Sequence, residues 1–116
     1  FDGLARSASN AAARAQLLRA EDAYEVLRRN LAGEVHQAAV TYEQALASER
    51  LANTAVASAA ENMKLTQQKY NVGSATILDL IDAQVQLQRA ESQLVSARAG
   101  IRVAEARLDQ VRGRDV

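Results

Sequence analysis

The chain has 116 residues and 14 basic against 14 acidic side chains, and because the two kinds are interleaved along it, no footprint for nucleic acid or anionic lipid is present. The absence of cysteine excludes disulfide bonds and thiolate metal sites. Proline is absent, alanine dominates the apolar residues and only four residues are aromatic, a composition that favours long helices over a compact core.

The first predicted helix covers about residues 4–69. Apolar residues in its C-terminal part recur at alternate spacings of three and four, as in a coiled-coil seam. The seam residues are Val35, Ala38, Tyr42, Ala45, Glu49, Ala52, Val56, Ala59, Met63, Thr66 and Tyr70. Glu49 is the one residue in this row that is ill-suited to burial.

A second apolar row lies further upstream in the same helix. It consists of Leu17, Ala20, Tyr24, Leu27 and Leu31. The steps from Leu27 to Leu31 and from Leu31 to Val35 are both four residues, a stutter that locally unwinds a supercoil. Gly33 lies inside the stutter, and we expect a bend or a close approach to a neighbour there.

A tight reversal is predicted at residues 70–75. Gly73 can adopt positive φ at the end of the first helix, and Lys69 in its last turn suits the helix dipole. Thr76 followed by Asp79 has the spacing of a capping box that starts the second helix, with Ser74 as an alternative N-cap. All these signals predict a hairpin.

The second predicted helix covers about residues 76–113 and has a strict heptad seam. The seam residues are Leu80, Ala83, Leu87, Ala90, Leu94, Ala97, Ile101, Ala104, Leu108 and Val111. Folding back at residue 72 would pair position i with about 144 − i, and the first thirty or so residues would overhang without a partner. The predicted fold is all-α: one long antiparallel helical hairpin, a coiled coil with unequal arms, over residues 1–116.

The turn and the start of the second helix read YNVGSATILDLIDAQ over residues 70–84. Together with the Leu/Ala ladder up to Gly113, this stretch resembles the outer membrane efflux protein (TolC) family, whose pattern is Tyr-x-x-Gly, a Leu-Asp-x-Leu-x-Ala-Gln-like stretch and Leu/Ala heptads. The Phe-Asp-Gly at residues 1–3 resembles the point where such proteins leave their β-barrel. The resemblance covers the whole chain.

The resemblance implies a fragment of a homotrimeric α-barrel, the periplasmic part of an outer-membrane channel in a Gram-negative envelope. The chain starts at Phe1 without a secretion signal, so we expect a piece of a larger channel protein. The implied function is a passive duct for multidrug efflux or type I secretion. A periplasmic adaptor and an inner-membrane transporter are the implied partners, and the isolated piece is expected to self-associate through its overhang.

Asp79 and Asp82 match an acidic pair that rings the periplasmic entrance in the family and favours cations. The two residues are three apart and share one helix face, so threefold symmetry would concentrate six carboxylates in a narrow mouth. The simpler interpretation is that both favour the positive end of the second helix, although Asp82 lies too far along the helix to gain much from the dipole.

Tyr70 matches a residue that latches the closed entrance, and Val72, Gly73 and Ser74 match the hairpin tip that contacts the adaptor. In the alternative interpretations Tyr70 completes the seam and residues 72–74 form an ordinary turn. The family's archetype has a basic residue where this chain has Ala75, so a latch that depends on that cation is missing here.

No enzyme chemistry is predicted from the sequence. His36 is the single histidine, so no two-imidazole metal site is possible, and a solvated helix position is expected for it. Catalytic residues, a metal and a cofactor are all expected to be absent, because no phosphate loop, nucleophile motif or zinc spacing occurs. Two other functions stay open: a coiled-coil structural or dimerisation module, and the helical hairpin of a periplasmic adaptor protein.

Overall fold

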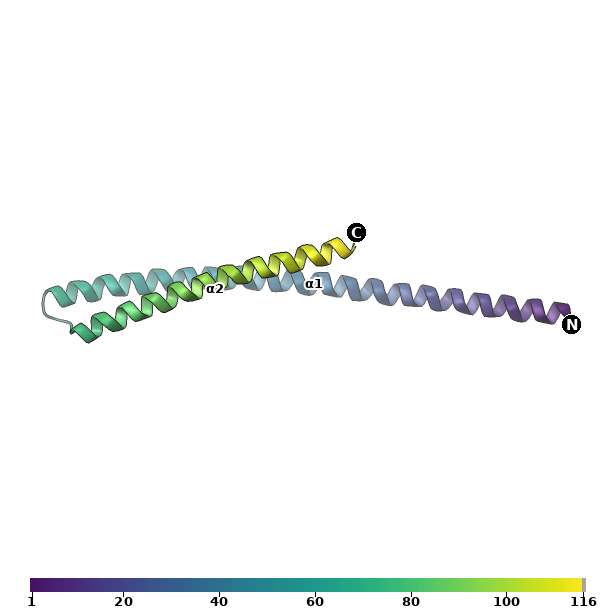
Figure 1. The fold of residues 1–116 in the computed structure, drawn as a ribbon, viewed down its shortest axis with the longest axis horizontal. Helices are drawn as coiled ribbons and strands as arrows, with labels where there is room; N and C mark the ends of the chain where they lie inside the picture. Colours follow the sequence, from purple (N-terminus) through teal and green to yellow (C-terminus); the bar gives the residue numbers. More distant parts are fainter. Residues whose placement is uncertain (116) are drawn as a thin grey trace.

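The computed structural model describes the backbone of residues 1–115 and the side-chain surroundings of residues 1–113. It consists of two helices, α1 (Asp2–Asn71) and α2 (Ile77–Asp115), joined by a short turn. They run antiparallel as one extended hairpin (Figure 1), which confirms the predicted fold class. The molecule is 106 Å long, close to the roughly 105 Å that an unbroken 70-residue helix spans.

The two helices meet along the predicted seams. All ten predicted seam residues of α2 are buried or half-buried, and so are ten of the eleven in the seam of α1. The most buried positions are largely alanine: Ala38, Ala52, Ala83, Ala90, Ala104, Leu108 and Val111. Small residues at alternate positions of each seam let the helix axes approach closely, and the aromatic residue Tyr42 packs against the buried cluster.

The pairing register differs from the predicted one by about two residues. Ala38 packs with Leu108 and Val111, and Val35 joins the same cluster. Pairing Ala38 with Leu108 gives numbers that sum to 146, whereas folding at residue 72 predicted 144. The predicted value was wrong because it ignored the phase of the two seams. The two seams face each other only when the numbers of paired residues add up to 139, 146 or 153. Of these values, only 146 places the centre of the reversal within the turn.

In this register most layers of the hairpin join one large residue to one small residue, and Val35 opposite Val111 is an exception. Leu108 packs against Ala38, and the same register sets Leu94 opposite Ala52 and Ala90 opposite Val56. Because the large residues alternate between the two helices, most layers fill a similar volume and the separation of the axes stays even.

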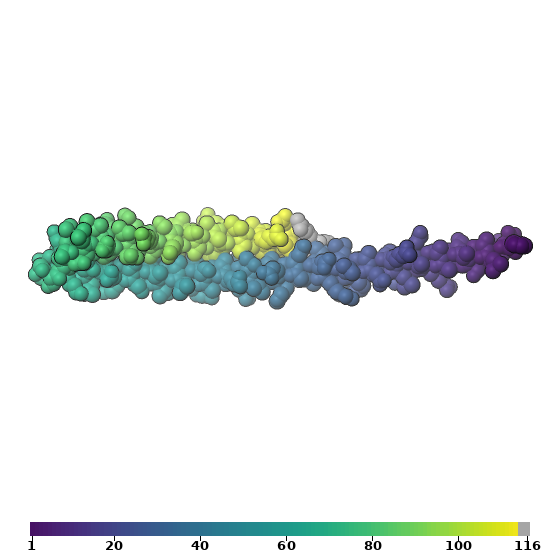
Figure 2. Space-filling view, turned by 90° about the horizontal axis from the view of Figure 1, so that it is seen from below, coloured from purple at the N-terminus to yellow at the C-terminus, as the bar shows by residue number. Residues whose placement is uncertain are grey.

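Residues 1–30, here called the arm, have no partner among the described residues. Every residue of the arm is exposed, and Figure 2 shows a single helix that continues beyond the end of α2. The helix passes unbroken through Gly33, where an added Cβ would meet nothing within 4 Å. The expected close approach at Gly33 is therefore not made by this chain. No helix in the described residues is apolar over the length that a bilayer requires.

Candidate functional site at the hairpin tip

Helix α1 ends in a turn that requires glycine. Gly73 has a φ of +79°, as predicted, and its N–H donates to the Tyr70 carbonyl at 3.0 Å. The Ser74 N–H donates to the Lys69 carbonyl at 2.7 Å. This pair of bonds is the Schellman motif, which satisfies two carbonyls at the end of α1. The tip is therefore an ordered turn.

Thr76 and Asp79 start α2 with a reciprocal pair of hydrogen bonds. The Thr76 N–H donates to Asp79 Oδ2 at 2.8 Å, and the Asp79 N–H donates to Thr76 Oγ1 at 3.2 Å. This is the predicted capping box, with Asp in place of the usual Glu. The structure selects Thr76 over Ser74 as the N-cap.

Asp79 is fully exposed, yet its environment favours the charged form. The hydrogen bond from the Thr76 backbone, the bond with the Thr76 side chain and the nearby Lys69 ammonium lower the pKa of the Asp79 carboxyl. The carboxylate therefore stays ionised at neutral pH. Asp79 has a local structural role, which the simpler sequence interpretation anticipated, and this role is compatible with a second one.

Asp79 and Asp82 line one open hollow between the helices, next to the turn. Its volume is about 350 Å³, and its lining is Asn62, Thr66, Lys69, Ser74, Ala75, Asp79, Asp82, Ala83 and Gln86. Lys69 brings a positive charge into the same hollow. Two carboxylates and one ammonium give the hollow a formal charge of −1, half of what the two aspartates alone would give. From the sequence, Lys69 is predicted only to interact with the helix dipole.

The remaining tip residues are accessible. Tyr70, the last residue of the seam row of α1, is 40% exposed. Val72 is 76% exposed and Ser74 is also on the surface. Ala75 is half-buried and lines the hollow. Val72, Gly73 and Ser74 thus form the outermost surface of the hairpin.

One polar contact between the helices is not predicted from the sequence. Arg98 Nε donates to Glu49 Oε1 at 3.4 Å, and this pair links the middle of α1 to the middle of α2. Glu49 was the misfit of the predicted seam. Its carboxylate reaches the edge of the seam, where Arg98 follows the seam residue Ala97. The sequence feature that could predict this pair is an acid, Glu49, in one seam and a base, Arg98, beside the other.

The single row of α2 residues directly opposite its seam has no charged residue. Every seventh position along this row is small or apolar: Leu78, Val85, Ser92, Ala99, Ala106 and Gly113. All six are exposed, and Leu78 is 69% exposed. A helix in a free two-stranded coiled coil normally has its most polar row here. We call these six residues the back row.

Among the described residues no group of three or more His, Cys, Asp or Glu side chains could hold a metal ion. His36 lies on the exposed surface of α1. The hollow at the tip is open to solvent, and the two carboxylates in it have no buried surroundings of the kind that set acid and base roles apart.

A model of the outer membrane efflux protein family matches residues 1–114, nearly the whole chain. No curated protein and no solved structure matches the chain in the corresponding comparisons.

Proposed function

The chain belongs to the outer membrane efflux protein family, and from this we propose that it forms part of the helical wall of the family's duct in the periplasm. The wall segment is a passive conduit, and an inner-membrane transporter with its periplasmic adaptor supplies the substrate. The trimer, the adaptor contact at residues 72–74 and the latch role of Tyr70 belong to this proposal.

The back row of α2 is the observation that carries the proposal. In a closed cylinder of helices each helix packs against a neighbour on both sides, so it needs two apolar rows. The seam of α2 covers one side, and Leu78, Val85 and Ala99 leave an uncharged surface on the other. An exposed apolar surface that runs along a helix is typical of a contact site with another segment.

The match to the outer membrane efflux protein family favours the proposed duct over the helical hairpin of an adaptor. The arm adds a further apolar surface that needs other helices to cover it. A simple dimerisation module would not need the back row of α2.

The hollow at the tip is proposed to face the entrance of the duct. In a threefold assembly its charge of −1 per chain would be repeated around one mouth and favour cations there. The carboxylates of Asp79 and Asp82 would attract cations, and the Lys69 ammonium would limit the effect.

Single-channel recordings of the full-length parent protein in lipid bilayers test this placement. We expect Asp79→Asn with Asp82→Asn to reduce cation selectivity and block by divalent ions, and Lys69→Met to increase both. Asp109→Asn removes one carboxylate near the far end of α2 and serves as the control. If the tip variants and the control all conduct like the wild type, the lumen assignment is wrong.

A further inference from the structure

The apolar residues of the two seams do not determine the register of the hairpin by themselves. Both seams repeat every seven residues and alternate mostly between large and small side chains. A shift of one heptad therefore places large residues opposite small ones again. Leu94, for example, lies opposite Ala52 at the observed sum of 146, opposite Ala45 at a sum of 139 and opposite Ala59 at a sum of 153. Another feature has to distinguish these three registers.

Glu49 is the one charged residue in the two seams. Its side chain is 28% exposed, and its carboxylate accepts a hydrogen bond from Arg98 Nε at 3.4 Å. Arg98 directly follows Ala97, the seam residue that lies opposite Glu49 in the observed register. Glu49 therefore meets the residue that follows the α2 seam alanine facing it.

The three residues of α2 that Glu49 could meet in this way alternate in charge. Each directly follows a seam alanine, and they are Glu91, Arg98 and Glu105. At a sum of 139 Glu49 would lie beside Glu91, and at a sum of 153 it would lie beside Glu105. Like charges at this distance are destabilising, whereas Glu49 and Arg98 attract each other. Of the three registers, only the observed one places opposite charges together here.

We propose that Glu49 and the row formed by Glu91, Arg98 and Glu105 specify the register of the hairpin independently of the turn. The attraction to Arg98 stabilises the observed register, and the two glutamates of α2 disfavour the registers one heptad away in either direction. A polar residue in a coiled-coil seam costs stability but is one way to select a single register. The contacts lie within one chain and do not depend on the proposed duct.

The turn also favours the sum of 146, so it has to be loosened before the charges can be tested. Gly73 with its positive φ and the capping box of Thr76 lie at the reversal in this register alone. Insertion of about eight glycine and serine residues between Gly73 and Ser74 gives a flexible connection. In this loosened chain the two helices can adopt any of the three registers.

Distances between two spin labels report the register of the loosened chain. The chain has no cysteine, so Ala47→Cys and Val85→Cys, both at exposed positions, supply the only labelling sites. At a rise of about 1.5 Å per residue, the labels are separated along the hairpin by about 21 Å at a sum of 146, about 10 Å at 139 and about 32 Å at 153. Dilution with unlabelled chain restricts the measurement to distances within one chain. We expect the loosened chain without further change to show the distance of the observed register alone.

Two exchanges of charge should move the register in opposite directions. Glu91→Arg with Arg98→Glu places the only base of the row beside Glu49 at a sum of 139, so the separation along the hairpin should shorten by about 10 Å. Arg98→Glu with Glu105→Arg does the same at a sum of 153, so the separation should lengthen by about 10 Å. Both exchanges leave the composition and the net charge of the chain unchanged.

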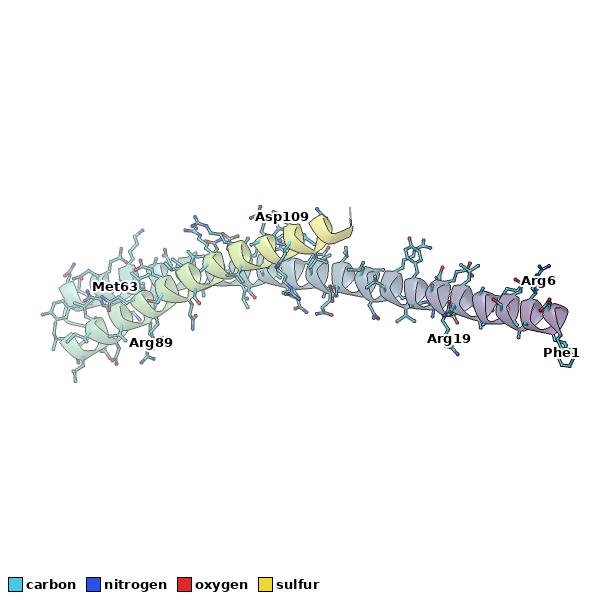
Figure 3. The ribbon with its side chains drawn as sticks, turned by 45° about the vertical axis from the view of Figure 1, so that its right-hand side comes forward. Phe1, Arg6, Arg19, Met63, Arg89 and Asp109 are labelled. Carbon is cyan, nitrogen blue, oxygen red and sulfur yellow. The ribbon has the colours of Figure 1, made fainter. Side chains whose placement is uncertain are left out.

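The matched control exchanges two charges outside the seam. Arg102 and Asp109 are exposed and seven residues apart on α2, and Figure 3 shows Asp109 projecting away from α1. Arg102→Asp with Asp109→Arg should therefore keep the distance of the observed register. Circular dichroism checks that every variant remains helical.

Glu49→Gln provides a test that adds no repulsion, so it decides the question even if an exchange variant unfolds. Without the charge at position 49 the loosened chain should populate several registers and give several distances. Each of four results would overturn the proposal: several distances in the loosened chain without further change, the original distance in both exchanges, a single distance in Glu49→Gln, or an equal shift in the control.

Discussion

Thr76 and Asp79 determine where α2 begins. Their two hydrogen bonds satisfy backbone N–H groups that have no partner inside the helix. The same carboxylate lines the hollow beside Asp82. One residue thus holds the tip in shape and contributes charge at its surface, so substitution of Asp79 affects both, whereas substitution of Asp82 changes charge alone.

Replacement of the cap residue should destabilise the hairpin. We expect Thr76→Ala to lower the free energy of unfolding by about 1 kcal/mol, the usual cost of a lost N-cap. Ser74→Ala removes a similar hydroxyl from the same turn but takes away no cap, so it should have little effect. Urea unfolding followed by circular dichroism compares the two. Equal losses for both variants would show that Thr76 does not cap α2.

The pKa of Asp79 predicts how stability depends on pH. The pKa of this carboxyl is lowered in the folded chain, so the folded chain binds fewer protons than the unfolded chain. The stability that results is fully present above the unfolded pKa of about 4. It is lost as the pH falls further, through the folded pKa.

Asp79→Asn keeps an oxygen acceptor for the Thr76 N–H but removes the ionisable group. We expect the variant to show a smaller loss of melting temperature between neutral and acidic pH than the wild type. Asp82→Asn, whose side chain takes no part in the capping box, is the control. An unchanged pH dependence in Asp79→Asn would mean that another group is responsible.

At the scale of the helices, the sequence predicts most of what the structure contains. Heptad spacing identified both seams, and Gly73 with Thr76 and Asp79 identified the reversal. The register differs from the predicted one by two residues, because the phase of the two seams determines it and not the centre of the turn. The Glu49–Arg98 pair was missed because it joins residues far apart in sequence.

The pairing of large with small residues predicts a specific response to overpacking. Ala38 is buried against Leu108, and Ala38→Leu should cost about 1–3 kcal/mol of stability. Adding Leu108→Ala should recover part of the loss, because the layer again joins one large and one small residue. Ala47→Leu on the exposed surface of α1 is the control and should stay within about 0.5 kcal/mol. Thermal unfolding of the four chains measures these differences.

The turn glycine and the helix glycine should respond in opposite directions. Gly73 has positive φ, so Gly73→Ala should destabilise the hairpin by about 1 kcal/mol. Gly33 is helical with open space at its Cβ, so Gly33→Ala should stabilise it by about 0.5–1 kcal/mol. Chemical denaturation measures both. A gain of stability in Gly73→Ala would contradict the Schellman turn.

At the scale of the whole molecule, this elongated hairpin leaves much of its apolar surface uncovered. The arm and the back row of α2 are both exposed. The sequence predicted the overhang, because α2 runs out opposite Leu31. It does not determine the roles of Asp82 or Tyr70, since these depend on which neighbouring helices surround the tip. The roles proposed for these two residues come from the family match and have to be tested by experiment.

Amide hydrogen exchange tests directly whether the arm depends on neighbours that this chain lacks. It would be measured on the dilute monomeric chain and on the assembled parent protein. In the isolated chain we expect strong protection over residues 35–70 and 77–111 and rapid exchange over residues 1–30, because a lone helix opens readily. In the assembled parent the arm should become as protected as the hairpin. Strong protection of the arm in the dilute chain, or rapid exchange of the arm in the assembled parent, would contradict the account.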